Sequence, residues 1–198
     1  MVFSSLSQGW LTSNVNTGVV VCYPIYMTLQ TGVTANSRGL AFANIYGLNS
    51  GTVHFFFVDW TKYLELSFIV SRMTSDAEAI ARVQLKEASV GGVLAERGIG
   101  VQISNYTMIG ESYGTVRGTT GTLLILSHQR NIHVRIVKTA AEVQFWVNGV
   151  LVETLVGTAV PNVEGGASAN LVISIINGAT GTINARFDIG NIQIVQEW

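Results

Sequence analysis

Charged side chains are scarce in this chain of 198 residues. Asp, Glu, Lys and Arg together make up 12% of it, whereas about 25% is typical of globular proteins. Most water-facing positions must therefore carry Ser, Thr, Asn, Gln or Gly, and such a surface is easily desolvated. The low charge favours packing against neighbouring molecules, although a thermostable or secreted β-protein with a neutral surface would have the same composition.

Basic clusters, cysteine pairs and apolar runs of membrane-spanning length are also missing. The eleven Lys and Arg residues are scattered and the formal net charge is −1, which argues against nucleic-acid binding through a basic face. Cys22 is the single cysteine, so no intrachain disulfide or multi-cysteine zinc site can form, and we expect a small buried residue there. The most apolar stretch, residues 18–29, contains Pro24 and is shorter than the roughly 18 apolar residues of a membrane span.

A secretory signal peptide is not recognisable at the N-terminus. The sequence MVFSSLSQGW lacks a basic n-region, a long apolar h-region and a cleavage signature. We therefore expect either that the chain does not follow the general secretory route or that this sequence is the mature form.

Catalytic motifs are lacking as well. The chain contains no G-x-S-x-G elbow, and its closest acidic pair is Asp76 and Glu78. Retaining glycosidases need two carboxyl groups about 5 Å apart, but Ser75 followed three residues later by Glu78 fits a capping box more simply. We predict that the protein has no catalytic residue and is not an enzyme.

Metal and cofactor sites are not indicated either. His128 and His133 stand five residues apart without an acidic cluster, which does not fit a metal pair. Asp188 follows Phe187 in the last apolar segment, and we expect it to bond a nearby backbone group. Calcium binding through carbonyl groups and Asn162 or Glu164 remains an open alternative. We predict no metal ligand and no cofactor.

Alternating apolar and polar residues are abundant, most clearly between residues 131 and 156. In NIHVRIVKTAAEVQFWVNGVLVETLV the alternation has period two on both sides of a short break at residues 139–141, which is typical of half-buried β-strands. Asn148 and Gly149 lie between two apolar runs and predict a type I′ hairpin turn. The segment is therefore predicted to be a three-strand antiparallel meander.

The register of the first hairpin follows from its link. A four-residue link at residues 138–141 pairs Arg135 with Gln144 and His133 with Trp146 on the polar face. The apolar partners are then Ile136 with Val143, Val134 with Phe145, and Ile132 with Val147. A slip of one residue would mix the two faces, so the pattern supports this pairing.

The rest of the chain also reads as strands. We predict them at residues 19–29, 40–46, 54–58, 63–73, 99–105, 108–113, 123–127, 171–176 and 182–195. Residues 74–87 fit either an amphipathic helix or a strand, and we favour a strand with Arg82, Gln84 and Lys86 outside. This predicts an all-β antiparallel sandwich of roughly 12–14 strands with at most one short helix. We expect one domain over residues 1–198, with residues 1–17 as an arm or first strand.

The order of these segments resembles the concanavalin A-like lectin/glucanase superfamily, which includes laminin-G-like and pentraxin-like modules. The resemblance rests on YLELSF, the HVRI and VQFWVNG strands, a Pro-bearing loop and the final FDIGNIQI, and it covers residues 40–195. It implies a jelly-roll sandwich of two large antiparallel sheets. Members of the superfamily bind glycans, hydrolyse them or build larger particles, and the fold does not choose among these roles.

The polar face of the predicted meander is a candidate glycan site. It carries Asn131, His133, Arg135, Gln144 and Trp146. A sugar site needs a flat aromatic group and planar hydrogen-bonding side chains, and this set supplies both. An ordinary outer sheet face, or a face buried against another subunit, would have the same residues. We expect Trp146 to be covered by protein, because an exposed Trp on a neutral sheet is unfavourable in water.

Taken together, these features predict a non-catalytic structural subunit of a larger assembly, such as a virus particle, a fibre or an extracellular filament. Self-association is the expected partnership, and the expected location is a virion or an extracellular assembly. A carbohydrate-binding, lectin-like module is the alternative, and a glycoside hydrolase ranks third. Neither nucleic acid nor a membrane span is expected.

Overall fold

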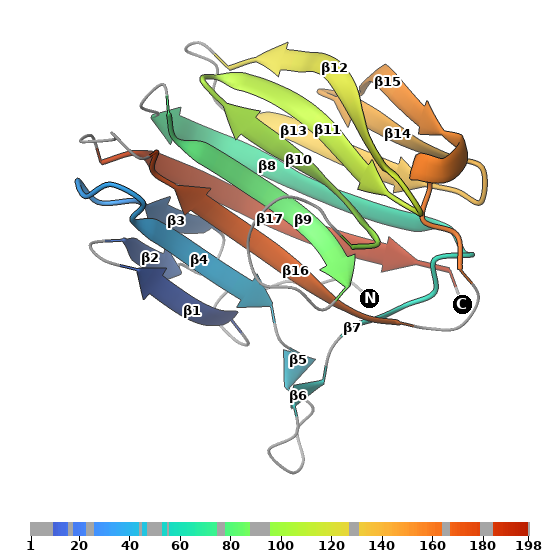
Figure 1. Ribbon diagram of the computed structural model, residues 1–198, viewed down its shortest axis with the longest axis horizontal. Helices are drawn as coiled ribbons and strands as arrows, with labels where there is room; N and C mark the ends of the chain where they lie inside the picture. Colours follow the sequence, from blue (N-terminus) through green and yellow to red (C-terminus); the bar gives the residue numbers. More distant parts are fainter. Residues whose placement is uncertain are drawn as a thin grey trace.

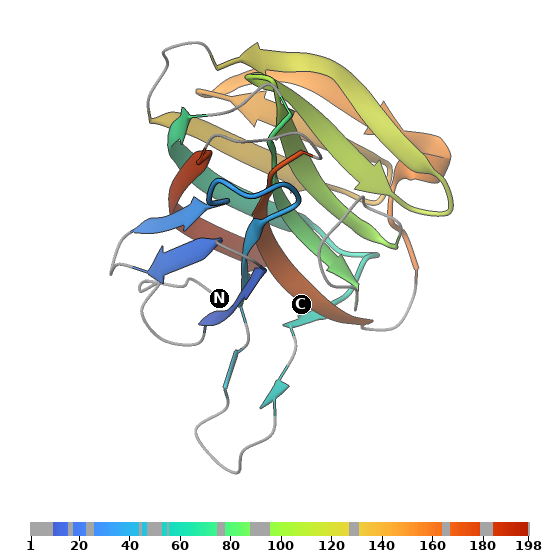
Figure 2. The same cartoon turned by 60° about the vertical axis from the view of Figure 1, so that its left-hand side comes forward.

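The computed structural model describes residues 10–15, 18–22, 26–43, 45–46, 53–54, 56–74, 78–87, 96–126, 131–163, 167–178 and 184–197. Within these ranges the chain forms seventeen strands, most of them in two antiparallel sheets packed face to face (Figures 1 and 2). The predicted all-β sandwich is confirmed.

Sheet A is the front layer in Figure 1, with the strand order β1-β4-β16-β9-β10-β11-β12 and with β7 paired to β16. Its strands are β1 (Trp10–Val15), β4 (Arg38–Ala43), β7 (Phe56–Val58), β9 (Ile80–Glu87), β10 (Gly98–Ser104), β11 (Thr107–Tyr113), β12 (Arg117–Ile125) and β16 (Ala167–Ile176).

Sheet B lies behind sheet A, with the strand order β15-β14-β13-β8-β17-β3-β2. Its strands are β2 (Val19–Cys22), β3 (Tyr26–Gln30), β8 (Leu64–Thr74), β13 (Ile132–Lys138), β14 (Glu142–Val147), β15 (Val150–Val156) and β17 (Arg186–Gln196). A small ribbon of β5 (Ile45–Tyr46) and β6 (Val53–His54) projects from the two layers in Figures 1 and 2. A 3₁₀ turn, η1 (Gly157–Ala159), follows β15.

The core lies between the sheets and is built by the alternation seen in the sequence. On β8, Leu64, Leu66, Phe68 and Val70 are buried, as predicted. In the ambiguous segment, residues 80–87 form a strand, β9, which turns its Ala81, Val83 and Leu85 side chains into the same core. The strand favoured for this segment, on the ground that its surroundings are β, is confirmed for residues 80–87.

The register predicted for the β13–β14 hairpin is wrong by two residues. The observed partners are Arg135 with Trp146, Ile136 with Phe145 and Val137 with Gln144. The strand β13 continues through Lys138, whose Nζ donates to the main-chain oxygens of Trp60 and Lys62. Because the error is an even number of residues, each side chain stays on its predicted face.

The predicted turn at Asn148 and Gly149 is confirmed. Their φ angles are 50° and 82°, so both central residues have the positive φ that a type I′ turn requires. Val147 pairs with Val150 directly across the turn. This two-residue connection fixes where the edge strand β15 begins.

Three predicted strands are each divided in two. Residues 19–29 form β2 and β3, which pair antiparallel with Val20 opposite Leu29; residues 40–46 contribute to β4 and β5, and residues 54–58 to β6 and β7. An apolar run does not show by periodicity alone whether it is one strand or two. The described part of the chain therefore has more strands than predicted.

Several predictions fall on residues outside the described ranges. These are Pro24, Ser75, Asp76, His128, Glu164 and residues 1–9, 16–17 and 88–95. Cys22 lies in β2, but its side chain is also outside the described part. Among the described residues, no helix is long and apolar enough to cross a membrane.

Candidate functional site

The structure brings together three residues of the predicted glycan face on sheet B. Arg135 of β13 lies opposite Trp146 of β14, and its guanidinium carbon is 5.7 Å from the centroid of the Trp146 ring. Trp146 is half-buried and donates from Nε1 to Gln144 Oε1 at 3.1 Å. The expectation that protein covers Trp146 is thus met in part, by a cation–π contact within the chain.

The Glu65 carboxylate neutralises the Arg135 guanidinium within the chain. Arg135 Nη2 lies 2.9 Å from Glu65 Oε2, and the Tyr63 hydroxyl donates to the same oxygen at 2.7 Å. Burial alone would raise the pKa of Glu65, but the hydrogen bonds from Arg135 and Tyr63 outweigh it and hold that pKa below its usual value. Glu142 accepts from Gln144 at 2.6 Å.

The two other predicted residues lie apart from this network. His133 has an exposed side chain, and its backbone N–H donates to Asn148 Oδ1 at 2.9 Å. Asn131 precedes β13 with φ of 56° and lines a pocket near β17. The predicted set is therefore divided: Arg135, Gln144 and Trp146 form an internally paired cluster, Asn131 lines a separate pocket, and His133 belongs to neither.

Asp188 differs from its predicted role. Its Oδ1 accepts from the Thr28 hydroxyl and from Arg186 Nε, each at 2.8 Å. Its partners are thus side chains rather than the backbone group that the sequence suggested. Among the described residues, no cluster of three or more His, Cys, Asp or Glu side chains is arranged to hold a metal ion.

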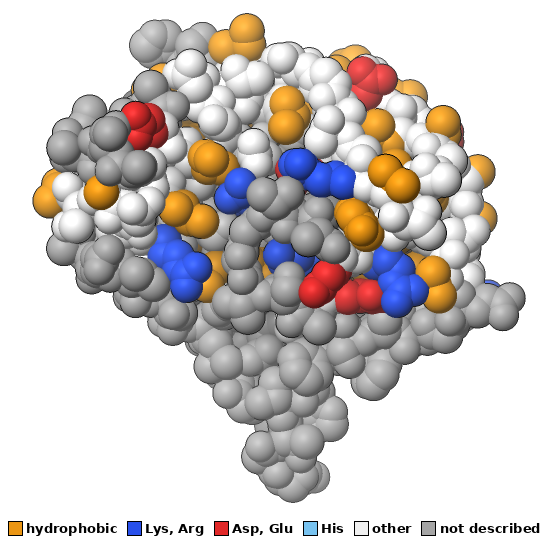
Figure 3. Space-filling model, in the orientation of Figure 1, with side chains coloured by type: hydrophobic (Ala, Val, Ile, Leu, Met, Phe, Trp, Pro, Cys, Tyr) orange, Lys and Arg blue, Asp and Glu red, His pale blue; other side chains and the backbone are white. Residues whose placement is uncertain are grey.

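A second polar group lies on the outer face of sheet A, where the sequence placed Arg82, Gln84 and Lys86 outside. These β9 side chains do point away from the core, but all three are buried. Figure 3 shows charged side chains of both signs gathered across the middle of this face. Buried charges need partners, so their hydrogen bonds decide what the face can do.

Two glycines of β10 allow these side chains to lie flat across the sheet. Gly100 is paired with Gln84 and Gly98 with Lys86. A Cβ atom at Gly100 would come within 2.8 Å of Gln84 Cγ, and one at Gly98 within 2.7 Å of Lys86 Cβ. Glycine is therefore required at both positions, because any side chain would occupy the space of its β9 partner.

Gln84 reaches across Gly100 to Glu111 on β11. Its Nε2 donates to Glu111 Oε2 at 2.9 Å, and Arg117 of β12 donates to the other carboxylate oxygen. Glu111 is 0% exposed, whereas the Arg117 side chain is 34% exposed. A buried carboxylate thus holds a cation at the rim of the face.

The remaining cations of the face are less well satisfied. Arg82 Nε donates to Gln102 Oε1 at 3.2 Å, an uncharged acceptor. Neither Lys86 Nζ nor Ser174 Oγ, both buried, has a hydrogen-bond partner among the described residues. Burial lowers the pKa of Lys86, with the Glu96 carboxylate opposing that effect. Unsatisfied buried polar groups are rare in folded proteins and often mark a functional site.

The sequence contained a signal for this face that we did not use. Arg82, Gln84 and Lys86 alternate with core residues on β9, and the facing strand β10 has glycine at two alternate positions, 98 and 100. When polar residues at alternate positions of one strand face glycines at alternate positions of the next, the polar side chains can lie across the neighbouring strand. The contact between Gln84 and Glu111 could not be predicted from the sequence, because it depends on the order of three strands.

Comparisons with known proteins extend this description. No protein-family model matches the chain, and no curated protein sequence matches it. Among solved structures, an endo-β-1,4-glucuronan lyase from the fungus Trichoderma reesei has a TM-score of 0.64 at 12% identity, over 100% of this chain and 95% of that one. The carbohydrate recognition domain of Emp47p has a TM-score of 0.62 at 10% identity, over 100% and 95% of the two chains.

A sialidase also matches, with a TM-score of 0.61 and 13% identity over 94% of this chain. The match covers 17% of the sialidase, so this chain spans a small part of that protein. At these identities the likeness is one of fold. The fold of this chain is that of the concanavalin A-like jelly-roll proteins.

Proposed function

We propose that this chain is a non-catalytic carbohydrate-binding protein that holds an acidic glycan against the outer face of sheet A. The observation that carries the proposal is a concentration of positive charge. Arg38, Arg82, Lys86 and Arg117 all lie on this one face, in a chain with eleven basic residues in total. Clusters of like charge on one face attract ligands of the opposite sign.

The face supplies both direct contact and an attractive field. Arg117 lies at the rim, and its planar guanidinium can donate to a carboxylate or sulfate oxygen. Lys86 lies beneath the surface without a hydrogen-bonded counter-ion among the described residues. In its charged form it attracts an anion above it through a medium of low dielectric constant, without touching the ligand.

Two of the carboxylates near this face, Glu111 and Glu87, are not arranged for glycoside hydrolysis. Glu111 is held between Gln84 and Arg117. Glu87, at the end of β9, accepts from Trp60 Nε1 at 3.0 Å and from Arg97 Nε at 2.8 Å. A hydrolase needs one carboxyl group as acid and another as nucleophile or base, and both of these carboxylates already bind cations. This supports binding without catalysis.

The fold comparison supports the same ligand class. One neighbour is a carbohydrate recognition domain, and another is named for glucuronan, a polymer of uronic acid. The fold by itself assigns no ligand. The local charge on sheet A is what favours an acidic glycan over a neutral one.

Calorimetric titration of the full chain with polyglucuronate and with a neutral β-glucan of similar length tests the proposal. We expect the acidic polymer to bind and Arg82→Gln to weaken it about tenfold with an unchanged melting temperature. Arg135→Gln, on sheet B, is the matched control and should leave the affinity unchanged. Equal binding of the neutral glucan, or equal effects of the two substitutions, would contradict the proposal.

A self-associating structural subunit is the second candidate, and an apolar strip favours it. Val150 and Val156 of the edge strand β15 are 63% and 64% exposed. Leu151 and Val152 of the same strand are also exposed, as is Ile125 of β12. Large exposed aliphatic groups at one end of a sandwich favour contact with a second copy of the chain. An assembly of this kind, in a virion or a filament, would be compatible with glycan binding.

Light scattering tests this second candidate. An assembly held by the strip should dissociate when Val150 and Val156 are both replaced by Lys, because two desolvated charges would oppose the contact. Val33→Lys is the control, since Val33 is also exposed but lies elsewhere. A monomeric wild-type protein at micromolar concentration would remove the support for this candidate.

A further inference from the structure

An open pocket lies on the outer face of sheet B, on the opposite side of the sandwich from the acidic-glycan face. Its volume is about 590 Å³, and it is bordered by β3, β8, β17 and the bend before β13. Pockets of about 300–1,000 Å³ are typical of small-molecule sites. The pocket is therefore large enough for one sugar residue or a short oligosaccharide.

Two β-bulges shape this pocket. Asp188 and Ile189 are paired with Arg72 and Val70, which leaves Ser71 as an extra residue on β8. The register shifts again between Gly190 and Gln193, at Asn191, whose φ is 49°. Bulges bend the strand and redirect side chains. Here they place Ser71 and Asn191 on the wall of the pocket.

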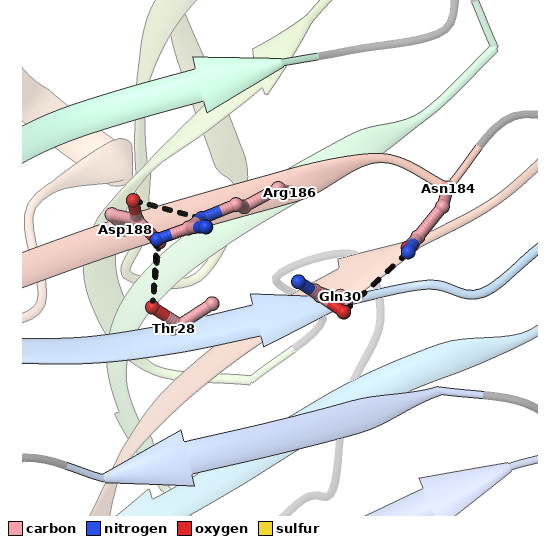
Figure 4. A network of polar contacts seen from close by, with 5 residues as sticks. All are labelled: Thr28, Gln30, Asn184, Arg186 and Asp188. Carbon is pink, nitrogen blue, oxygen red and sulfur yellow. Dashed lines mark hydrogen bonds and ion pairs between the residues drawn. The ribbon is translucent and has the colours of Figure 1, made fainter.

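A charge-balanced network forms the floor. Figure 4 shows the Arg186 guanidinium, the Asp188 carboxylate and the Thr28 hydroxyl converging from β17 and β3. Arg186 Nε donates to both oxygens of Asp188, at 2.8 and 3.0 Å. The ion pair neutralises itself, so the floor gives no preference for a charged ligand. Asp188 Oδ2 accepts this hydrogen bond from Arg186, and a carboxylate oxygen has capacity for a second.

The walls add the groups that recognise a polyhydroxylated ring. Tyr26 supplies an aromatic ring, and Asn131 and Asn191 supply planar amides. Both asparagines have positive φ, a conformation that Asn tolerates better than most residues. Their exposed amides can donate to and accept from neighbouring hydroxyls.

We propose that this pocket binds an uncharged sugar residue, with its apolar C–H face on Tyr26 and its hydroxyls on the two asparagines and Asp188. The site is separate from the proposed acidic-glycan face, and either can fail without the other. The two faces would then bind ligands of different charge.

NMR titration of the ¹⁵N-labelled full chain tests this site, with the methyl glycosides of glucose, galactose and mannose as probes. We expect at least one glycoside to shift the side-chain amides of Asn131 and Asn191 saturably, at low and high salt alike. Asn191→Gly keeps the positive φ but removes the amide, and should weaken that binding about tenfold. Asn131→Gly should have a similar effect.

Asn105→Gly provides the matched control. Asn105 is an exposed asparagine with φ of 46° in the β10–β11 turn, so the same substitution there should leave binding unchanged. The spectra themselves report whether each variant is folded. The proposal is overturned if none of the three glycosides shifts the pocket amides, if Asn105→Gly weakens binding as much as Asn191→Gly, or if the shifts disappear at high salt.

Discussion

On the outer face of sheet B, Arg135 and Arg186 each have a carboxylate within hydrogen-bonding distance, at 2.9 Å from Glu65 and 2.8 Å from Asp188. On the outer face of sheet A, Arg82 faces an amide and Lys86 has no hydrogen-bond partner among the described residues. Both faces belong to one charge-poor chain. The difference shows where the sequence satisfies its own charges, and the proposed function assigns the less satisfied charges of sheet A to a ligand.

The largest expected effect comes from filling the space that sheet A keeps for Gln84. Gly100→Ala should lower the free energy of unfolding by about 3–4 kcal/mol, because the new methyl group overlaps Gln84 and the adjacent backbone. Gly121→Ala is the control, since its Cβ would have 4.0 Å to the nearest atom, Glu153 Oε2. Urea denaturation measures both, and equal effects would show that the packing of Gln84 is not the cause.

Matched carboxylate substitutions sharpen the comparison of the two faces. Glu111→Gln should cost about 2–3 kcal/mol, because it leaves Arg117 beside a buried neutral group. Glu65→Gln should cost about 1 kcal/mol or less, because its ion pair is partly exposed. Chemical denaturation at neutral pH compares them. A larger loss for Glu65→Gln would contradict the assignment of the more buried charge to sheet A.

Replacing each of two fully buried lysines by Met should change the free energy of unfolding in opposite directions. Lys138→Met leaves the Trp60 and Lys62 carbonyls without their donor and should cost about 1–3 kcal/mol. Lys86→Met removes a cation without a hydrogen bond and should raise the free energy of unfolding by about 1 kcal/mol. Denaturant midpoints give both values. A loss of stability in Lys86→Met would mean that the ammonium is satisfied in the folded protein.

The pH dependence of stability isolates Lys138. Burial lowers its pKa to about 8, with Asp59 opposing that effect, whereas an unfolded lysine titrates near 10.4. Unfolding therefore takes up a proton between these pH values, and the wild-type protein gains stability as the pH rises through this window. Lys138→Met lacks that gain, so the difference in unfolding free energy should widen from about pH 8 to about pH 10. A constant difference would contradict the lowered pKa.

Trp146→Ala should lower the free energy of unfolding by about 1–2 kcal/mol, because the ring is half-buried and loses one cation–π contact. We expect this variant to bind polyglucuronate as the wild type does, since Trp146 lies on sheet B. Thermal denaturation and calorimetry measure the two properties. Loss of polyglucuronate binding with retained stability would move the ligand site to sheet B.

The sequence predicted the elements of this fold well, because alternation is a local property. The inward residues of β8 and the turn at Asn148 and Gly149 follow from nearest-neighbour patterns, whereas the strand at residues 80–87 was favoured because the segments around it are β. The β13–β14 register did not follow, because the link between the strands is shorter than the four residues expected: Lys138 belongs to β13 and pairs with Val143. Alternation fixes the face of each side chain and leaves a shift of two residues open.

The candidate sites were predictable to a smaller degree. Arg135, Gln144 and Trp146 do meet, but the carboxylates that satisfy the cluster come from β8 and from β14 itself. The burial of Gln84 depends on its reach across Gly100 to Glu111, and therefore on the order of β9, β10 and β11. The pocket at Tyr26 and Asp188 depends on two bulges, and these appear in the pairing of β8 with β17 rather than in either strand alone.

The salt dependence of polyglucuronate binding tests the central claim most directly, because the claim is that unbalanced charge on sheet A selects the ligand. We predict that the affinity of the full chain falls steeply as salt rises, and that Arg82→Gln reduces the steepness while Arg135→Gln does not. Binding that is insensitive to salt, or a salt dependence reduced by Arg135→Gln alone, would contradict it.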